Sequence, residues 1–355
     1  WDIEAKSSHG DFPLPKKSYK KVATELVNIV FTKKLEEKVA ELELVRRCIY
    51  TAFGYDNIEG MSKVYLINEK EYDDFQLRNN IDDLIEFLED KEGLLCKQNR
   101  HKLISEIEKV MGMYHEIKWK NELKWEGTFP KIKGDEVTMI GTTIVRLGER
   151  EPYKNYIAVV GSCTDIVEID NREIVEYKTE RDLLLGWSKW IGKHRLNIMI
   201  GYYVFGFDWT FLLQRTDELK CQHQFLKNLS RFKSEPAKSI RKIITVASGT
   251  HDDIYVKMEG CLQMDLAAHF RKTVNLDSYK LDNVAAHYIG DKVKKYEYNE
   301  DTDKTLIVSK NLMGLKNGDY CCLKLSKYST NYYKNGKKFI VSDVNAKEGT
   351  FHIDS

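Results

Sequence analysis

The strongest constraint on the fold of this chain is a change in the spacing of its apolar residues. From about Tyr19 to Trp125 apolar residues recur every three or four positions, which is typical of amphipathic helices. The segments on either side carry short apolar runs bounded by turn residues, which is typical of strands. We therefore expect a helical excursion of roughly a hundred residues from a sheet, with the first strand and the returning strand near Val137 as antiparallel neighbours.

The sequence after Phe129 predicts alternating strands and helices. Thr179 and Asp182 resemble a capping box that opens a helix with an apolar stripe, and another helix is predicted from about Trp209 to Leu219. Such alternation is typical of an α/β fold. From Asp303 onward, short apolar runs separated by Asn-Gly and Glu-Gly turns predict a small all-β module. Strands are predicted at 1–5, 137–147, 156–160, 163–169, 197–201 and 261–266, and in the β module at 305–308, 320–325, 339–344 and 350–353.

The composition excludes several classes of protein. Hydrophobic residues make up 42% of the 355 residues, and 56 Lys and Arg nearly balance 55 Asp and Glu, which argues against a disordered or polybasic chain. No apolar run reaches the roughly 20 residues that span a bilayer, so we expect no membrane association. Seven cysteines without a Cys-x-x-Cys pair favour a reducing compartment. Residues 217–242 hold seven Lys or Arg against three acids, and form the basic segment of interest.

Two carboxylates near the start of the chain are candidate metal ligands. Asp2 and Glu4 are two positions apart on a predicted strand, so their side chains leave the same face. Paired carboxylate oxygens suit Mg²⁺ or Mn²⁺. Alone the pair is weak evidence, because Asp90 and Glu92 have the same spacing on what reads as a solvated helix surface.

A third candidate follows the predicted strand that ends at Gly201. The segment 201–208 reads Gly-Tyr-Tyr-Val-Phe-Gly-Phe-Asp, and Asp208 precedes a predicted helix. Asp208 can cap that helix, which is the reading favoured by the local pattern alone. Its carboxylate can also point toward the strand that bears Asp2.

Taken together and in order, these segments resemble the 3′–5′ proofreading exonuclease domain of family B DNA polymerases, and of their delta-like branch in particular. The loop 8–13 and the helical excursion are most similar to polymerases of large double-stranded DNA viruses. Five ordered matches are far more specific than any one of them. They lie at residues 1–5, 135–141, 201–215, 259–265 and 276–285.

The resemblance implies a fold and a division of the chain. It implies an α/β, RNase H-like (DnaQ-like) exonuclease fold formed by residues 1–17 and 127–302. Residues 18–126 are then a large helical insertion. Residues 303–355 are a small β-rich insertion that the end of the chain interrupts.

The resemblance also implies a mechanism and its residues. Asp2, Glu4 and Asp208 would be catalytic and would bind two Mg²⁺ or Mn²⁺ ions for phosphodiester hydrolysis. Aromatic side chains near Asp208 would stack unpaired bases of the primer 3′ end, although core packing is an equally good reading of Phe207. His9 is expected to be a hydrogen-bonding residue of a loop rather than a general base. The candidate DNA-binding residues are Tyr202, Tyr203, Phe205, Phe207, Lys227, Arg231 and Lys233.

Two departures from the family pattern stand out. Tyr203 occupies a position where the family usually has Asn, and the third exonuclease motif, a Tyr and an Asp on one helix face, is not found. The Asp-rich palm motifs of the polymerase are also absent from the sequence. We therefore expect a fragment of a replicative DNA polymerase that binds metal and single-stranded DNA weakly, does not extend primers and degrades 3′ ends poorly.

Two other functions remain open from the sequence. One is a stand-alone RNase H-like 3′–5′ exonuclease, which would not need so large a helical insertion. The other is a catalytically dead domain that only binds DNA, against which the three intact acids speak. For the polymerase reading, the expected partners are DNA and a sliding clamp or other replisome proteins. The expected location is an intracellular site of replication, in the host nucleus or a viral factory.

Overall fold

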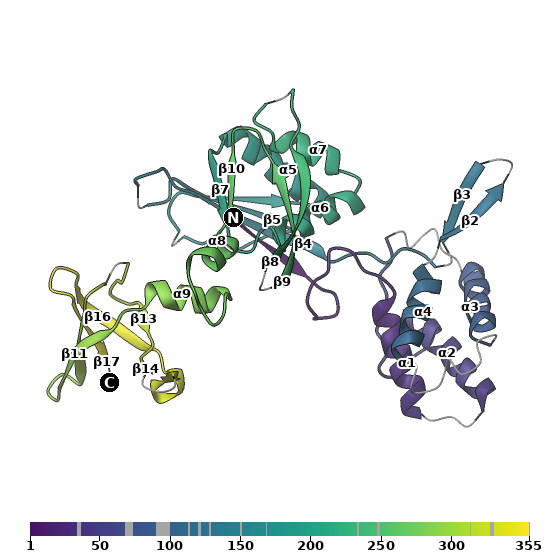
Figure 1. Cartoon of the computed structure of the whole chain (residues 1–355), viewed down its shortest axis with the longest axis horizontal. Helices are drawn as coiled ribbons and strands as arrows, with labels where there is room; N and C mark the ends of the chain where they lie inside the picture. Colours follow the sequence, from purple (N-terminus) through teal and green to yellow (C-terminus); the bar gives the residue numbers. More distant parts are fainter. Residues whose placement is uncertain are drawn as a thin grey trace. The chain divides into compact units, whose positions relative to one another are not determined.

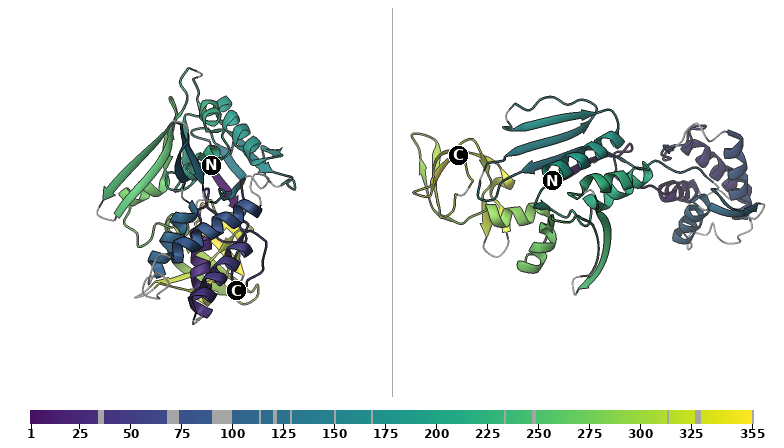
Figure 2. Two further views of the ribbon diagram at one scale, coloured as in Figure 1. Left: turned by 90° about the vertical axis from the view of Figure 1, so that its right-hand side faces the viewer. Right: turned by 90° about the horizontal axis from the view of Figure 1, so that it is seen from above.

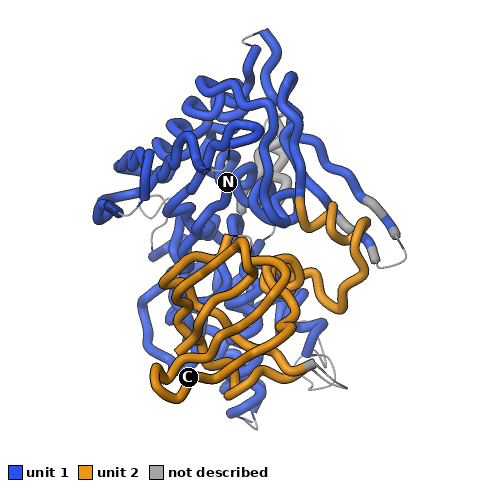
Figure 3. The backbone as a smooth tube through the Cα atoms, turned by 90° about the vertical axis from the view of Figure 1, so that its left-hand side faces the viewer, with its two compact units in different colours: residues 1–265 blue, residues 266–355 orange. Residues whose placement is uncertain are grey.

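A computed structural model of the chain describes residues 1–33, 37–67, 74–89, 100–112, 114–119, 122–127, 129–149, 151–167, 169–232, 234–246, 249–312, 314–326 and 330–354. The structure is mixed α/β, in agreement with the predicted class. It divides into two compact units, residues 1–265 and 266–355 (Figure 3).

The main sheet of the first unit has four strands in the order β1-β4-β5-β6 (Figure 1). These are β1 (Asp2–Lys6), β4 (Glu136–Ile144), β5 (Lys154–Val160) and β6 (Arg172–Tyr177). Strand β1 pairs antiparallel with β4, with Asp2 opposite Gly141. The predicted pairing of the first strand with the returning strand is confirmed.

The fourth strand lies later in the sequence than predicted. The prediction of a strand at 163–169 is wrong, because residues 163–167 and Ile169 belong to the loop that precedes β6, and residue 168 lies outside the described residues. Asn171 takes a left-handed φ of 52°, and the Arg172 guanidinium pairs with Asp165 at 2.7 Å, so the loop folds back on itself. The chain thereby enters β6 parallel to β5 rather than as a hairpin.

Helices cover the sheet and supply most of its core. Helix α5 (Glu180–His194) packs against β4, β5 and β6, and α7 (Gln222–Leu229) packs beside α5 (Figure 2). The predicted helix start is confirmed, because Thr179 is the N-cap residue and its Oγ1 accepts a hydrogen bond from the Asp182 amide at 3.2 Å. The Asp182 carboxylate accepts from the Thr179 hydroxyl at 2.7 Å and not from the Thr179 amide as in a full capping box. Trp187 of α5 and Trp209 of α6 (Asp208–Glu218) are fully buried, and both rings contact the ring of Trp1.

Two further strands bring distant segments to the beginning of β1. Strand β7 (Ile198–Gly201) runs parallel to β10 (Leu262–Asp265), with Asp265 opposite Gly201. The main-chain nitrogen of Trp1 donates to the Ile200 carbonyl at 3.1 Å, so β1 begins beside β7. A hairpin of β8 (Lys238–Val246) and β9 (Gly249–Lys257), which was not predicted, contacts the β7–α6 loop through Ile254 N and Phe205 O at 2.9 Å.

The helical excursion between β1 and β4 has its own apolar core. Its helices are α1 (Lys20–Lys33), α2 (Lys38–Ala52), α3 (Asp74–Glu89) and α4 (Arg100–Gly112). Val27, Val45, Ile81 and Ile107 are fully buried in that core. The predicted helical pattern extended to Trp125, but β2 (Tyr114–Trp119) and β3 (Glu122–Gly127) instead pair as antiparallel strands.

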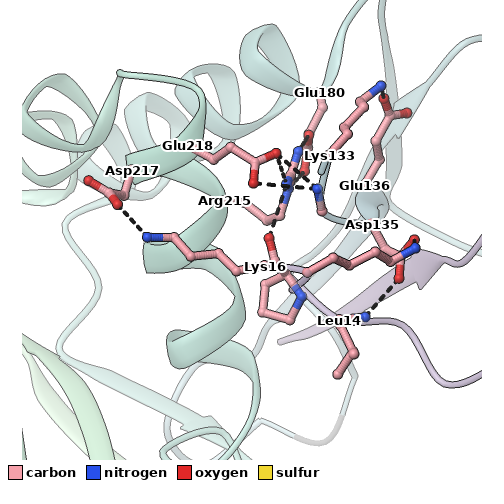
Figure 4. A network of polar contacts seen from close by, with 12 residues as sticks. Leu14, Lys16, Lys133, Asp135, Glu136, Glu180, Arg215, Asp217 and Glu218 are labelled. Atoms are coloured by element: carbon pink, nitrogen blue, oxygen red, sulfur yellow. Dashed lines mark hydrogen bonds and ion pairs between the residues drawn. The ribbon is translucent and has the colours of Figure 1, made fainter. Parts of the chain in front are cut away.

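A buried polar network fixes both connections to this excursion (Figure 4). The Arg215 side chain of α6 is fully buried and pairs with Glu180 of α5 through two hydrogen bonds of 2.8 and 2.7 Å. Its Nη1 donates to Glu218 at 2.6 Å and to the Pro15 carbonyl at 3.1 Å. Arg215 therefore ties the outgoing connection to two helices.

The returning connection is held by the same acids. Glu180 also accepts a hydrogen bond from the Val137 amide at 2.9 Å, and Glu218 accepts one from the Gly134 amide at 3.1 Å. Next to them, Asp135 accepts a hydrogen bond from the Leu14 amide at 2.8 Å and thereby links the two connections directly (Figure 4).

The second unit begins with α8 (Leu266–Thr273) and α9 (Leu281–Ile289) and continues as a β module. Its five-stranded sheet has the order β11-β12-β17-β16-β13, with a separate hairpin of β14 and β15. The predicted strands at 305–308, 339–344 and 350–353 are confirmed, whereas the single strand predicted at 320–325 is divided between β13 and β14, which belong to different sheets. Strands β11 and β15 were not predicted, and all residues of β11 are exposed. The strands are β11 (Val293–Asn299), β12 (Lys304–Ser309), β13 (Tyr320–Cys321), β14 (Lys324–Ser326), β15 (Thr330–Tyr332), β16 (Phe339–Asn345) and β17 (Thr350–Asp354).

Candidate active site

Two of the three candidate acids meet where β1 and α6 begin. Asp2 lies on the exposed face of β1, whereas Asp208 is the first residue of α6 and is only 2% exposed. The Ile3 amide lies between their carboxyl groups and donates to Asp2 Oδ1 at 3.1 Å and to Asp208 Oδ1 at 3.3 Å, so the two groups are neighbours. The residue in the capping position of α6 is Phe207, so the reading of Asp208 as a helix cap is not what the structure has.

The contact between these acids changes the pKa of Asp208. Burial of the carboxyl raises this pKa most, and the charge and hydrogen bond of Asp2 raise it further, to about 7. Two carboxylates in contact cannot both be ionised without a compensating charge. The pair therefore needs either a shared proton or a cation.

Glu4 lies on the same exposed face of β1 as Asp2. Within the part of the chain that the structure describes, no group of three or more Asp, Glu, His or Cys side chains is arranged to hold a metal ion. The structure thus brings Asp2 and Asp208 together and does not add Glu4 to them. Glu4 as a metal ligand stays a prediction.

The chemistry of the pair fits a hard divalent cation. Its donors are carboxylate oxygens, which Mg²⁺ and Mn²⁺ prefer. A cation bound at this point would lower the raised pKa of Asp208, since a positive charge favours the ionised carboxyl.

We expect the metal-free chain to lose stability as pH rises from about 4 to 7. The unfolded Asp208 ionises near its ordinary pKa of 3.8 while the folded group keeps its proton up to about 7, so the unfolded state binds fewer protons between these values. The loss is on the order of 3 kcal/mol and is complete above pH 7. Thermal unfolding in EDTA across this range measures it.

The control for this pH dependence is Asp208→Asn, which keeps an oxygen that can accept from Ile3 and removes the charge. This variant should unfold at a temperature that changes less with pH. Added Mg²⁺ should stabilise the wild-type chain at pH 8 and not the variant. A wild-type profile that rises from pH 4 to 7 in parallel with the variant would contradict the assignment.

A fourth acid, which was not predicted as a site residue, holds the loop between β7 and α6. The buried carboxylate of Asp265, at the end of β10, accepts hydrogen bonds from the amides of Tyr203 and Phe205 at 2.9 Å each. The available signal in the sequence was an acid at the end of the strand predicted at 261–266, within one of the five segments that resemble the family. Asp265 therefore fixes the loop that delivers Asp208 to Asp2.

We expect Asp265→Ala to free this loop. Two amides lose their acceptor, and each unsatisfied group costs about 1–3 kcal/mol. The measurement is amide hydrogen exchange, in which residues 202–207 should exchange at least tenfold faster while β4 and β5 stay protected. Asp265→Asn retains one acceptor and should give an intermediate rate. Unchanged exchange in both variants would show that other contacts hold the loop.

Tyr203, at a position where the family usually has Asn, has an unusual backbone conformation. Its backbone has a left-handed φ of 61°, a conformation in which Asn is several times more frequent than bulky residues. Its ring lies against Gly206, where an added Cβ would come within 2.5 Å of a ring carbon. The turn therefore depends on glycine at 206 once tyrosine occupies 203.

The predicted aromatic residues are arranged in two groups. Phe205 is half-buried with its ring 5.3 Å from that of Tyr255, whereas Phe207 lies 5.6 Å from the exposed ring of Phe12. Tyr202 is half-buried and Tyr203 is exposed. Phe207 also packs against the core, as the packing interpretation of the sequence expects, and its stacking on DNA bases stays a prediction.

Two of the three predicted basic residues lie within the described part of the chain. Lys227 is exposed on α7, whereas the Arg231 guanidinium donates to the Leu196 carbonyl at 2.8 Å just beyond α5. Lys233 lies outside the described residues. His9 Nε2 lies 2.6 Å from the Lys63 carbonyl, which confirms the expectation that it hydrogen-bonds a loop.

Comparison with known proteins places these residues in a family context. The sequence model described as "DNA polymerase family B, exonuclease domain" matches residues 90–284, more than half of the chain. A DNA polymerase of Phaeocystis pouchetii virus is 29% identical over all of this chain and 39% of its own length. A DNA polymerase of Pyramimonas orientalis virus is 30% identical over 90% of this chain and 27% of its own length.

Cellular relatives match a shorter part. The DNA polymerase delta catalytic subunit of Candida albicans is 28% identical over 50% of this chain and 17% of its own length. The chain thus spans about two fifths, or less, of the length of these relatives.

Proposed function

Because the chain belongs to DNA polymerase family B and carries the exonuclease domain of that family, we propose that it removes nucleotides from the 3′ end of a DNA strand. The observation that carries this proposal is the contact between Asp2 and the buried Asp208, two acids from distant segments. In the full-length protein this reaction would proofread the primer end of a replicative polymerase.

The proposal includes an RNase H-like fold for residues 1–17 and 127–302. The order β1-β4-β5-β6, with β7 beside β1 and helices over the sheet, supports it. Residues 18–126 are proposed as a helical insertion, and residues 303–355 as a β-rich insertion.

Asp2, Glu4 and Asp208 would hold two Mg²⁺ or Mn²⁺ ions. When bound, such ions polarise the scissile phosphate and lower the pKa of water. The protein contributes by holding the carboxylates that would bind these ions in position. The Ile3 amide orients the Asp208 carboxylate, and Asp265 fixes the loop that precedes it, so little reorganisation is needed on binding.

The aromatic residues of the same loop would position the DNA strand. The rings of Phe207 and Phe12 are neighbours, and the Phe12 side chain is 70% exposed to solvent. Unpaired bases stack on such rings without regard to sequence, as degradation of any 3′ end requires. Tyr202, Tyr203 and Lys227 are proposed to add contacts to the same strand.

The direct test is incubation of the chain at enzyme excess with Mn²⁺ and a single strand labelled at its 5′ end. Slow shortening from the 3′ end that requires metal is the expected result. Binding without shortening, even after long incubation, would favour a domain that only binds DNA. Cleavage inside the strand would contradict an exonuclease.

Partners and location are part of the proposal, which the relatives support only in being DNA polymerases. The substrate would be single-stranded DNA at a primer end, and a sliding clamp or another replisome protein would bind the full-length polymerase. The site of action would be intracellular, where DNA is replicated. Among the described residues, none of the helices has the length and apolar character that crossing a bilayer requires.

A further inference from the structure

A strongly one-sided positive charge lies in the β module rather than at the candidate active site. Residues 320–340 contain five lysines, four tyrosines and no acidic residue, in a chain whose net charge is +1. This segment covers β13, the β14–β15 hairpin and the beginning of β16. We call its described lysines and tyrosines the Lys/Tyr surface: Tyr320, Lys324, Tyr332, Tyr333, Lys334, Lys337 and Lys338.

The side chains of the Lys/Tyr surface point to solvent. Tyr320 is 63% exposed and Tyr332 is 51% exposed, which is unusual for aromatic residues that have an apolar core nearby. Lys324 and Tyr332 face each other across the β14–β15 hairpin, with the Lys324 ammonium 5.0 Å from the tyrosine ring centre. The Lys324–Tyr332 pair therefore offers a positive charge beside a flat aromatic ring.

A second cluster adjoins the hairpin. The Tyr333 ring stacks on the buried Phe339 at 6.2 Å, which holds it in place, and the Lys334 ammonium lies 5.6 Å from the Tyr333 ring centre. The Lys337 ammonium lies 5.0 Å from the Phe339 ring. The rings are thus supported by the β module while the lysines stay at the surface.

We propose that the Lys/Tyr surface binds single-stranded nucleic acid without base preference. Lysine ammonium groups form charge contacts with phosphates, and exposed tyrosine rings stack on the faces of unpaired bases. An acidic protein would use the lysines and leave the exposed rings without a partner. This inference does not rest on the proposed exonuclease activity, because it concerns other residues and needs no metal.

The test is fluorescence anisotropy of labelled dT20 and U20 with the full 355-residue chain in EDTA, which prevents hydrolysis. The triple variant Lys324→Gln, Lys334→Gln, Lys337→Gln should bind at least tenfold more weakly. Its plot of log affinity against log salt should lose a slope of about 2, since each phosphate contact contributes about 0.7 on single strands. The matched control is Lys310→Gln, Lys316→Gln, Lys347→Gln, which changes the same charge at exposed positions of the same module.

A second pair of variants tests the rings. Tyr332→Ala should weaken binding about tenfold, as expected for one lost base stack. The control Tyr296→Ala removes a tyrosine that is 72% exposed on β11, outside the Lys/Tyr surface, and should bind like wild type. Circular dichroism of each variant verifies folding.

Three results would overturn the proposal. One is an equal loss of affinity in the Lys/Tyr variants and their controls. Another is displacement of dT20 by polyglutamate at equal charge concentration, which would indicate general anion binding. The third is a more than tenfold difference between dT20 and U20, because stacking and phosphate contacts do not distinguish the sugars.

Discussion

Arg215→Met is expected to destabilise the first unit by about 3–5 kcal/mol. The substitution leaves the buried carboxylates of Glu180 and Glu218 without the cation that compensates them. It also removes the hydrogen bond to Pro15 that anchors the outgoing connection. Urea unfolding followed by tryptophan fluorescence measures the loss, because Trp187, Trp190 and Trp209 all lie in the adjoining core.

The matched control is Arg241→Met, which removes an exposed arginine paired with Asp252 on the β8–β9 hairpin. An exposed pair of this kind is worth about 1 kcal/mol or less. A triple variant with Arg215→Met, Glu180→Leu and Glu218→Leu should recover part of the stability, since no unpaired charge remains. If Arg215→Met lowers the free energy of unfolding no more than Arg241→Met does, water reaches the buried network and solvates its carboxylates.

Asp2→Asn is expected to lower degradation of a DNA 3′ end by about a thousandfold. Neutralising this carboxylate removes one of the two acids in contact, and several kcal/mol of transition-state stabilisation correspond to this factor. The variant should also bind Mn²⁺ more weakly, which electron paramagnetic resonance of the free ion measures. Cleavage is measured at enzyme excess so that a slow wild-type rate stays observable.

The control for the Asp2 variant is Glu149→Gln, which neutralises an exposed carboxylate between β4 and β5. It should leave both Mn²⁺ binding and cleavage unchanged. If Asp2→Asn degrades DNA as fast as the Glu149 variant, the activity does not arise at this pair. If Mn²⁺ binding is lost while cleavage persists, the Asp2–Asp208 pair binds metal without catalysing the reaction.

Several features of this protein are determined by the sequence over short distances. The spacing of apolar residues predicted the helices between β1 and β4 and most strands of the main sheet, and Thr179 with Asp182 predicted where α5 begins. The order of motifs identified the family, and with it the pairing of β1 with β4. These features are readable because backbone period and helix caps depend on residues within a few positions of each other.

Other features were decided only when distant segments came together. Nothing near Arg215 or Asp265 in the sequence shows that one guanidinium is fully buried between two acids, or that one carboxylate holds two amides of another loop. The local pattern at Asp208 favoured a helix cap, and contact with Asp2 and Ile3 instead turned its carboxyl toward β1. Burial and partner choice depend on which surfaces the fold excludes from water, and that exclusion is a property of the whole tertiary structure rather than of any local segment.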